Sequence, residues 1–138
     1  MLIGIPKMIS PDLLKVLSEM GHGDEVVIAD GNFPAAANAR NLVRMDGHNV
    51  CDVLKAILEL FPLDKQSPQC VSVMQTADGS KPPIWVEFNQ LMEEKHYQIE
   101  FAEIERFEFY NKAQKAYCII ATTEPALYAN VILKKGVL

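Results

Sequence analysis

Two short apolar runs constrain the fold of this chain more than any other feature of its sequence. Residues 26–29 and 117–121 are continuous, rich in β-branched side chains and too short for ordinary helices. A half-exposed strand alternates apolar and polar residues, so a continuous run predicts a strand that is buried on both faces of a parallel sheet. Asp30 directly follows the first run and is therefore expected at the carboxyl end of that strand.

The segments around these runs show helical periodicity. Ser10 and Pro11 predict a helix start, and Leu13, Leu17 and Met20 then recur at spacings of four and three on one face. Further helices are predicted over residues 34–40, 50–61, 84–92 and 107–115, and further strands over residues 70–74 and 130–133. Helices that alternate with buried strands predict an α/β fold, here one compact domain (residues 1–138) with a mostly parallel sheet flanked by helices.

Length and charge exclude several classes of function. The chain has 138 residues and a mass of 15.4 kDa, which leaves no room for separate cofactor and substrate domains. No run reaches the roughly 18 apolar residues of a membrane helix, and the first ten residues lack the apolar stretch of a signal peptide. The net charge of −5 argues against a general nucleic-acid binder. We expect neither a membrane nor a nucleic acid among its partners.

The cysteines and two of the histidines do not form reactive clusters in the sequence. Cys51, Cys70 and Cys118 are too few and too scattered for a disulfide framework or a zinc site. Their apolar or helical contexts predict buried structural thiols, and a reducing cytoplasm is the simplest location. His48 and His96 have no partner at metal-ligand spacing, so no metal site is predicted.

The densest group of reactive side chains surrounds His22. Gly21 and Gly23 flank this histidine, which leaves the imidazole open and allows a sharp turn of the backbone. A histidine titrates at about pH 6.5, so it can both give and take a proton near neutrality. Ligands of open α/β sheets bind beyond the carboxyl ends of strands, and His22 with Asp30 therefore predicts a site. The alternative is a helix-stop turn that exposes a histidine without function.

Polar residues near the C-terminus are further candidates. Arg106 precedes an aromatic helix, where it is either a surface residue or a ligand contact. Tyr128 and Asn130 are two residues apart at the start of the last predicted strand, and so are expected on one face of it. Such a pair suits a polyhydroxylated ligand and equally suits ordinary edge pairing. The pair at positions 134 and 135 is expected to be two solvated lysines.

Several short motifs occur in order along essentially the whole chain. They are Met20-Gly21-His22-Gly23-Asp24-Glu25, Asp30, Phe33-Pro34-Ala35, Asp46-Gly47, Glu105-Arg106-Phe107-Glu108-Phe109-Tyr110, Lys115-Ala116, Tyr128-Ala129-Asn130 and Lys134-Lys135-Gly136-Val137. In this order they resemble the L-fucose mutarotase and ribose pyranase family. The segment that begins at Arg106 resembles the fucose branch, because the ribose branch tends to carry histidine near that point.

The resemblance implies an isomerase that exchanges the α and β anomers of a free monosaccharide, here L-fucose or a related pyranose, without metal or cofactor. It also implies a ribose pyranase-like α/β subunit in a homo-oligomer, often a decameric ring, with sites near subunit contacts. Carried over residue by residue, His22 matches the proton donor of the family. The matches to its sugar-binding positions are Asp30, Arg106, Tyr128, Ala129 and Asn130. Asp64, as a catalytic residue, and Met74 fall where some members place further site residues, which can reach a neighbouring subunit.

The implied chemistry agrees with the residue types. Anomer exchange opens the pyranose ring and recloses it, so one proton must leave the anomeric hydroxyl and one must reach the ring oxygen. His22 and Tyr128 are the side chains expected to move these protons. No hydride, phosphate or electron is transferred, so no cofactor is needed. Three other functions stay open: a ribose-type pyranase that exchanges pyranose and furanose forms, a non-catalytic sugar-binding or regulatory module, and a metal-dependent hydrolase.

Overall fold

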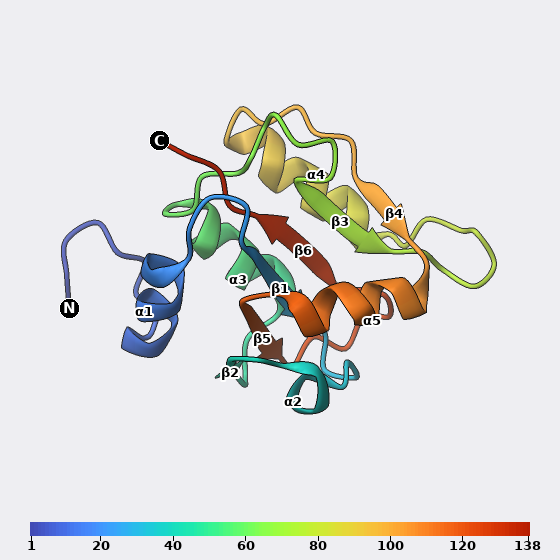
Figure 1. Ribbon diagram of the computed structural model, residues 1–138, viewed down its shortest axis with the longest axis horizontal. Coiled ribbons are helices and arrows are strands. Elements are labelled where there is room, and N and C mark those ends of the chain that lie inside the picture. Colours follow the sequence, from blue (N-terminus) through green and yellow to red (C-terminus); the bar gives the residue numbers. More distant parts are fainter.

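The computed structural model describes residues 1–138 and contains one mixed sheet with helices on both faces (Figure 1). The helices are α1 (Pro11–Glu19), α2 (Ala35–Asn38), α3 (Val50–Leu58), α4 (Ile84–Glu94) and α5 (Arg106–Lys115). The strands are β1 (Glu25–Ala29), β2 (Leu42–Met45), β3 (Val71–Met74), β4 (Ala102–Ile104), β5 (Cys118–Thr122) and β6 (Val131–Lys134). The predicted α/β class is confirmed. No helix combines the length and the apolar character that a bilayer-spanning helix needs.

The strand order places the two apolar runs side by side in the middle of the sheet. The order is β2-β5-β1-β6-β3-β4. β5 runs parallel to β1 and β2, and β3 runs parallel to β4, whereas β6 is antiparallel to both of its neighbours. Because β6 is antiparallel to β1, its first residues lie beside the carboxyl end of β1 and its last residues lie beside the amino end.

The central strands are buried on both faces because each face has its own hydrophobic core. Alternate side chains of a strand point to opposite faces. Val26 and Ile28 of β1 pack with α1, α3 and α4, whereas Val27 and Ala29 pack with α2 and α5. Figure 1 shows α5 and α2 crossing one side of the sheet, with α3 and α4 on the other. The continuous apolar run therefore predicted the burial of β1 correctly.

Capping side chains set the helix boundaries, but the sequence did not predict the two edge strands, β2 and β4. The Ser10 side chain accepts a hydrogen bond from the backbone N–H of Leu13, and Asn49 caps α3 through the N–H of Asp52. β2 and β4 have only four and three residues and carry exposed polar side chains. Such short edge strands present too little apolar pattern to be predicted.

The three cysteines are free, and their surroundings oppose ionisation. Burial raises the pKa of Cys118 to about 11 and that of Cys70 above its usual value. Cys51 is only half-buried, but partial burial and the nearby carboxylates of Glu87 and Glu124 raise its pKa to about 12. The thiolate is the nucleophilic form, so all three thiols are expected to be unreactive in the folded protein.

Alkylation tests this expectation. Incubation of the folded protein with iodoacetamide at neutral pH should leave the intact mass unchanged over the time in which free cysteine is consumed. In guanidinium chloride, which removes the burial, the same treatment should add three carbamidomethyl groups. Rapid modification of Cys51 in the folded state would contradict the pKa derived from its surroundings.

Candidate functional site

Asp30 and Asn130 form a buried hydrogen-bonded pair at the carboxyl end of β1. The backbone N–H of Asp30 donates to Asn130 Oδ1 at 2.8 Å, and Asn130 Nδ2 donates to Asp30 Oδ2 at 2.9 Å. Asp30 follows β1 and Asn130 precedes the antiparallel β6, so the sheet itself brings them together. Both are buried, at 5% and 3% exposure. The pair fixes a carboxylate at the position where open α/β sheets bind ligands.

A cavity of about 270 Å³ lies at this pair and is called the Asp30 pocket below. It is lined by Asp30, Asn32, Phe33, Met74, Arg106, Tyr110, Leu127, Tyr128 and Asn130. Its residues come from the segment after β1, the end of β3, the first two turns of α5 and the segment before β6. The pocket therefore brings together five of the candidate residues of the sequence. Ala129 is not among the lining residues: its side chain is buried and only its backbone faces the Asp30 carboxyl.

Arg106 is held against an aromatic wall of this pocket. Its Nε donates to the Tyr110 hydroxyl at 3.1 Å, and its guanidinium carbon lies 5.5 Å from the centre of that ring. Tyr110 also packs edge-on against Phe33, with ring centres 5.4 Å apart. Sequence reasoning did not select Tyr110 as a site residue, nor Asn32 or Leu127. For Tyr110 the signal existed, because residues four apart on a helix face each other.

Tyr128 adopts a backbone conformation that is rare for its residue type. Its φ is 57°, in the left-handed region. Tyr128 was expected at the start of the last strand, but it lies before β6, which begins at Val131. A left-handed residue other than glycine costs about 1–3 kcal/mol and persists where the surroundings fix it. Tyr128 and Asn130 nevertheless line the same pocket. The strained turn, and not strand alternation, is what places them together.

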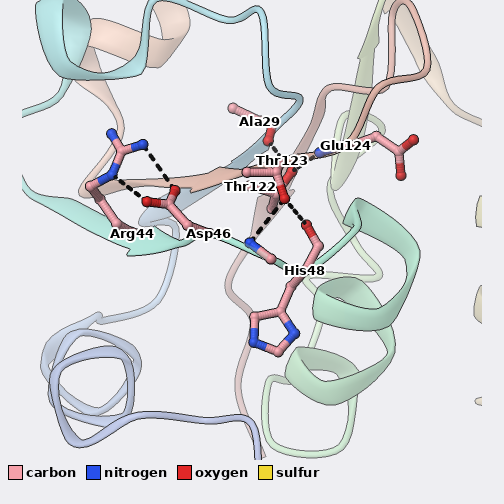
Figure 2. A network of polar contacts seen from close by, with 8 residues as sticks. Ala29, Arg44, Asp46, His48, Thr122, Thr123 and Glu124 are labelled. Atoms are coloured by element: carbon pink, nitrogen blue, oxygen red, sulfur yellow. Dashed lines mark hydrogen bonds and ion pairs between the residues drawn. The ribbon is translucent and has the colours of Figure 1, made fainter.

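A network of hydrogen bonds from the end of β5 holds the backbone on both sides of Asp30, and Figure 2 shows its contact with Ala29. Thr122 Oγ1 donates to the Ala29 carbonyl at 2.7 Å and accepts from the N–H of Glu124 at 3.2 Å. The N–H of Gly31 donates to the Glu124 carbonyl at 2.9 Å. In Figure 2 the His48 imidazole points away from this network, which uses only its carbonyl. His48 therefore has no part in the pocket.

Burial raises the pKa of the Asp30 carboxyl above its usual value. Hydrogen bonds from the Asn32 backbone and the Asn130 side chain oppose this effect in part, because they favour the charged form. The Asp30 carboxyl is thus both fixed in position and easier to protonate than an exposed aspartate. Such a group can accept hydrogen bonds from ligand hydroxyls at a defined geometry.

His22 lies at the other end of β1, in a separate cavity of about 300 Å³ that is called the His22 pocket below. Its Nε2 is 3.5 Å from Asp64 Oδ2. The imidazole is 60% exposed, whereas the Asp64 side chain is only 17% exposed. The cavity is lined by His22, Pro62, Leu63, Asp64, Lys65, Gln66, Tyr97 and Val137. A largely covered carboxylate therefore lies beside an accessible imidazole in this pocket.

The two pockets have no residue in common. His22 precedes β1 and Asp30 follows it, and a strand of five residues spans about 16 Å. His22 and Asp30 therefore do not meet within one chain. They are close in sequence but not in space, because β1 lies between them and places them at its opposite ends.

The two lysines near the C-terminus also differ from expectation. Lys134 and Lys135 are half-buried and are not a solvated pair. Lys134 Nζ is 3.2 Å from the hydroxyl of Ser67, and Lys135 Nζ donates to the carbonyls of Leu17 and Met20 at the end of α1. The Lys135 ammonium therefore holds the end of α1, and the Lys134 ammonium holds the Ser67 side chain, beside the His22 pocket.

A larger cavity, of about 980 Å³, adjoins the Asp30 pocket and shares Leu127 and Tyr128 with it. Its charged lining residues are all acidic: Asp52, Asp78, Glu87 and Glu124. These carboxylates do not make a metal site, since no group of three or more potential ligands comes together in the structure. The cavity therefore presents an acidic surface beside the candidate site.

Comparison with known proteins gives consistent matches over the full chain. The sequence matches the RbsD / FucU transport protein family over residues 3–138. Fucose mutarotase of Homo sapiens is 43% identical over 143 aligned residues, which cover 98% of this chain and 93% of the relative. The crystal structure of fucose mutarotase from Streptococcus pneumoniae in complex with L-fucose has a TM-score of 0.93 and 47% identity, and 99% of each chain is covered. Bacillus subtilis RbsD complexed with D-ribose has a TM-score of 0.71 at 24% identity, covering 94% of this chain and 95% of that chain, which shows the fold alone.

The raised pKa of Asp30 predicts how the stability of the fold depends on pH. The folded protein holds the Asp30 proton more tightly than the unfolded chain does, so ionisation costs stability as the pH rises through this pKa. Asp30→Asn removes the ionisation. The thermal midpoint of the wild type minus that of Asp30→Asn should therefore be highest in acid and fall as the pH rises from about 4 towards neutrality.

Asp78→Asn is the control with the opposite sign. Hydrogen bonds from Ser80 and Thr76 lower the pKa of Asp78 to about 2, so its contribution is present above the unfolded pKa and is lost as the pH falls. The midpoint of the wild type minus that of Asp78→Asn should be smallest in acid. A difference for Asp30→Asn that rises with pH in the same way would contradict the effect of burial.

Proposed function

Because this chain belongs to the RbsD / FucU transport protein family, we propose that it is a mutarotase that interconverts the α and β anomers of free L-fucose. The observation that carries the proposal is the near-complete match to a fucose mutarotase in complex with L-fucose. A ribose-type pyranase is the second candidate. The likeness to the relative with D-ribose bound supports only the common fold.

The Asp30 pocket suits a 6-deoxy pyranose. The buried carboxylate of Asp30 and the amide of Asn130 bind sugar hydroxyls, and Arg106 supplies further donors at the rim. L-fucose carries a methyl group where many hexoses carry a hydroxymethyl group. Phe33 and Met74 provide an apolar wall for it. The single tryptophan, Trp85, is buried in the core on α4 and lines neither pocket.

Ring opening requires two coordinated proton transfers. A base removes the proton of the anomeric hydroxyl while an acid protonates the ring oxygen, which breaks the bond between that oxygen and the anomeric carbon. The open-chain aldehyde then rotates, and the reverse transfers close the ring on its other face. Tyr128 and His22 move these protons. Asp64 contacts Nε2 of His22 and so helps to hold the imidazole in position for this transfer.

His22 and the Asp30 pocket meet between subunits of a homo-oligomer, for which a decameric ring is the expected form. Three features support this arrangement. The first is the separation of the pockets within one chain. The second is that each pocket has an exposed apolar residue at its rim, Leu127 in one and Val137 in the other, whose burial favours association. The third is charge, because Lys65 beside Asp64 complements the acidic cavity that adjoins the Asp30 pocket.

The remaining properties follow from the same proposal. The whole chain, residues 1–138, acts as one mutarotase domain, and its partners are the free sugar and further copies of itself. Proton transfer between these side chains and the sugar requires no cofactor. Three free cysteines support a reducing, cytoplasmic location.

Exchange spectroscopy by NMR on equilibrated L-fucose tests the activity. The wild type should accelerate exchange between the α and β signals well above the rate in buffer. His22→Ala and Tyr128→Phe should each lower the catalysed rate by roughly 10²–10⁴-fold, the usual contribution of one acid or base, while sugar affinity changes little. His96→Ala is the matched control, because His96 is exposed and lines neither pocket.

The outcomes separate the alternatives. Exchange at the buffer rate in the presence of wild-type protein would remove the mutarotase and leave a sugar-binding module. Faster exchange between pyranose and furanose forms of D-ribose than between anomers of L-fucose would favour the pyranase.

Mixing of two inactive variants tests the sharing of the site. His22→Ala retains an intact Asp30 pocket, and Arg106→Ala retains an intact His22. When the two are unfolded and refolded together in equal amounts, about a quarter of the intersubunit sites combine both intact halves and regain activity. Each variant refolded alone should stay inactive. If the mixture shows only the sum of the separate activities, the complete site lies within one subunit and the arrangement is wrong.

A further inference from the structure

The segment of residues 134–136 lies between the loop that carries His22 and the loop that carries Asp64. On one side, the N–H of Gly23 donates to the Lys135 carbonyl and the N–H of Lys135 donates to the Asp24 carbonyl, both at 2.8 Å. On the other side, the N–H of Asp64 donates to the Lys134 carbonyl at 3.0 Å. The same short segment therefore sets the position of both members of the His22–Asp64 pair.

Gly136 allows the Asp64 loop to pack directly on this segment. It is buried, and its N–H donates to the Pro62 carbonyl at 2.8 Å. A Cβ at this position would lie 2.6 Å from the Leu63 carbonyl oxygen and 2.9 Å from the Cα of Asp64, closer than real side chains come to backbone atoms. The φ of Gly136 is not in the left-handed region, so glycine is required here for space and not for backbone freedom.

The C-terminal segment is the fixed partner in this contact. It continues β6, which pairs with β1 and β3 in the middle of the sheet. The Lys135 ammonium is also bound to the last carbonyls of α1. The Asp64 loop, in contrast, has one bridge to the sheet, between Leu63 and Lys135. An added methyl group at position 136 would therefore displace the Asp64 loop and leave the strand in place.

We propose that Gly136 is a positioning residue that holds the Asp64 carboxylate against Nε2 of His22. The proposal rests on the proposed function, in which His22 moves one of the two protons of ring opening and Asp64 contacts its imidazole. Its physical basis is the close approach itself: the 3.5 Å separation of Asp64 Oδ2 and His22 Nε2 exists only while the backbone of the Asp64 loop touches a residue without a side chain. Misplacement of a catalytic group by about 1 Å costs of the order of 10²-fold in rate.

Gly136→Ala tests the proposal through two readouts. The anomer exchange rate should fall by about 10- to 100-fold with unchanged affinity for L-fucose, because the Asp30 pocket is not altered. The ¹⁵N shifts of the His22 ring should show a changed balance of tautomers, since the carboxylate no longer favours the proton on Nε2. Gly21→Ala is the matched control, because a Cβ there meets only Asp24 Oδ2 at an ordinary 3.7 Å. It should keep the wild-type tautomer.

A double-mutant cycle with Asp64→Asn separates positioning from general damage. If Gly136 acts through Asp64, Gly136→Ala causes no further loss of rate in the Asp64→Asn background. Losses that multiply in the double variant, or an unchanged His22 tautomer, would overturn the proposal. If Gly136→Ala does not fold, Lys135→Met replaces it in the same double-mutant cycle. This variant removes the ammonium group that binds the end of α1, and so loosens the segment without a steric clash. If the wild type itself does not accelerate exchange, the proposed function fails, and the tautomer measurement still decides the role of Gly136.

Discussion

The pairing of β1 with β5 and β6 is the constraint on which the rest of the molecule depends. β1 is buried on both faces, and its register with its two neighbours leaves it no freedom to bend or slide. The segments that precede and follow β1 are therefore held at opposite ends of a stiff strand. His22 and Asp30 are separated for this reason, and a site that uses both requires a second copy of the chain. In the proposed arrangement, a folding requirement of the single subunit thus becomes a requirement for assembly.

The antiparallel orientation of β6 has an effect at each edge. At the carboxyl end of β1 it brings Asn130 to Asp30, so that a buried carboxylate has a side-chain donor of its own. At the amino end it brings the C-terminal segment between the His22 and Asp64 loops. A parallel strand in the same place would supply neither contact, because its ends would be reversed. One reversed strand in an otherwise parallel arrangement therefore organises both pockets.

The sequence predicted the elements of the fold well and the geometry of the site only in part. Apolar runs and helix caps are local signals, so β1, β5, α1 and α3 could be identified from a few residues each. The grouping of Asp30 with Arg106 and Asn130 came from a family resemblance, because no local pattern reports contacts between residues so far apart in the chain. Gly136 was visible only as part of a motif. Its role depends on a steric contact with Asp64, which no composition or spacing could have indicated.

A site divided between subunits requires each half to be rigid before they meet. Ordering a loop at the moment of association costs conformational free energy, which weakens both assembly and catalysis. In this chain the Asp30 half is fixed by the Asn130 pair, the Thr122 network and the strained turn at Tyr128. In the His22 half the imidazole itself is largely exposed, and the Lys134 and Lys135 ammonium groups hold the elements around it. The backbone adds to this rigidity, because a glycine at position 136 lets the His22 and Asp64 loops pack on one strand end. On this argument, the absence of a side chain at position 136 helps to hold the His22 pocket rigid, as buried hydrogen bonds hold the Asp30 pocket rigid.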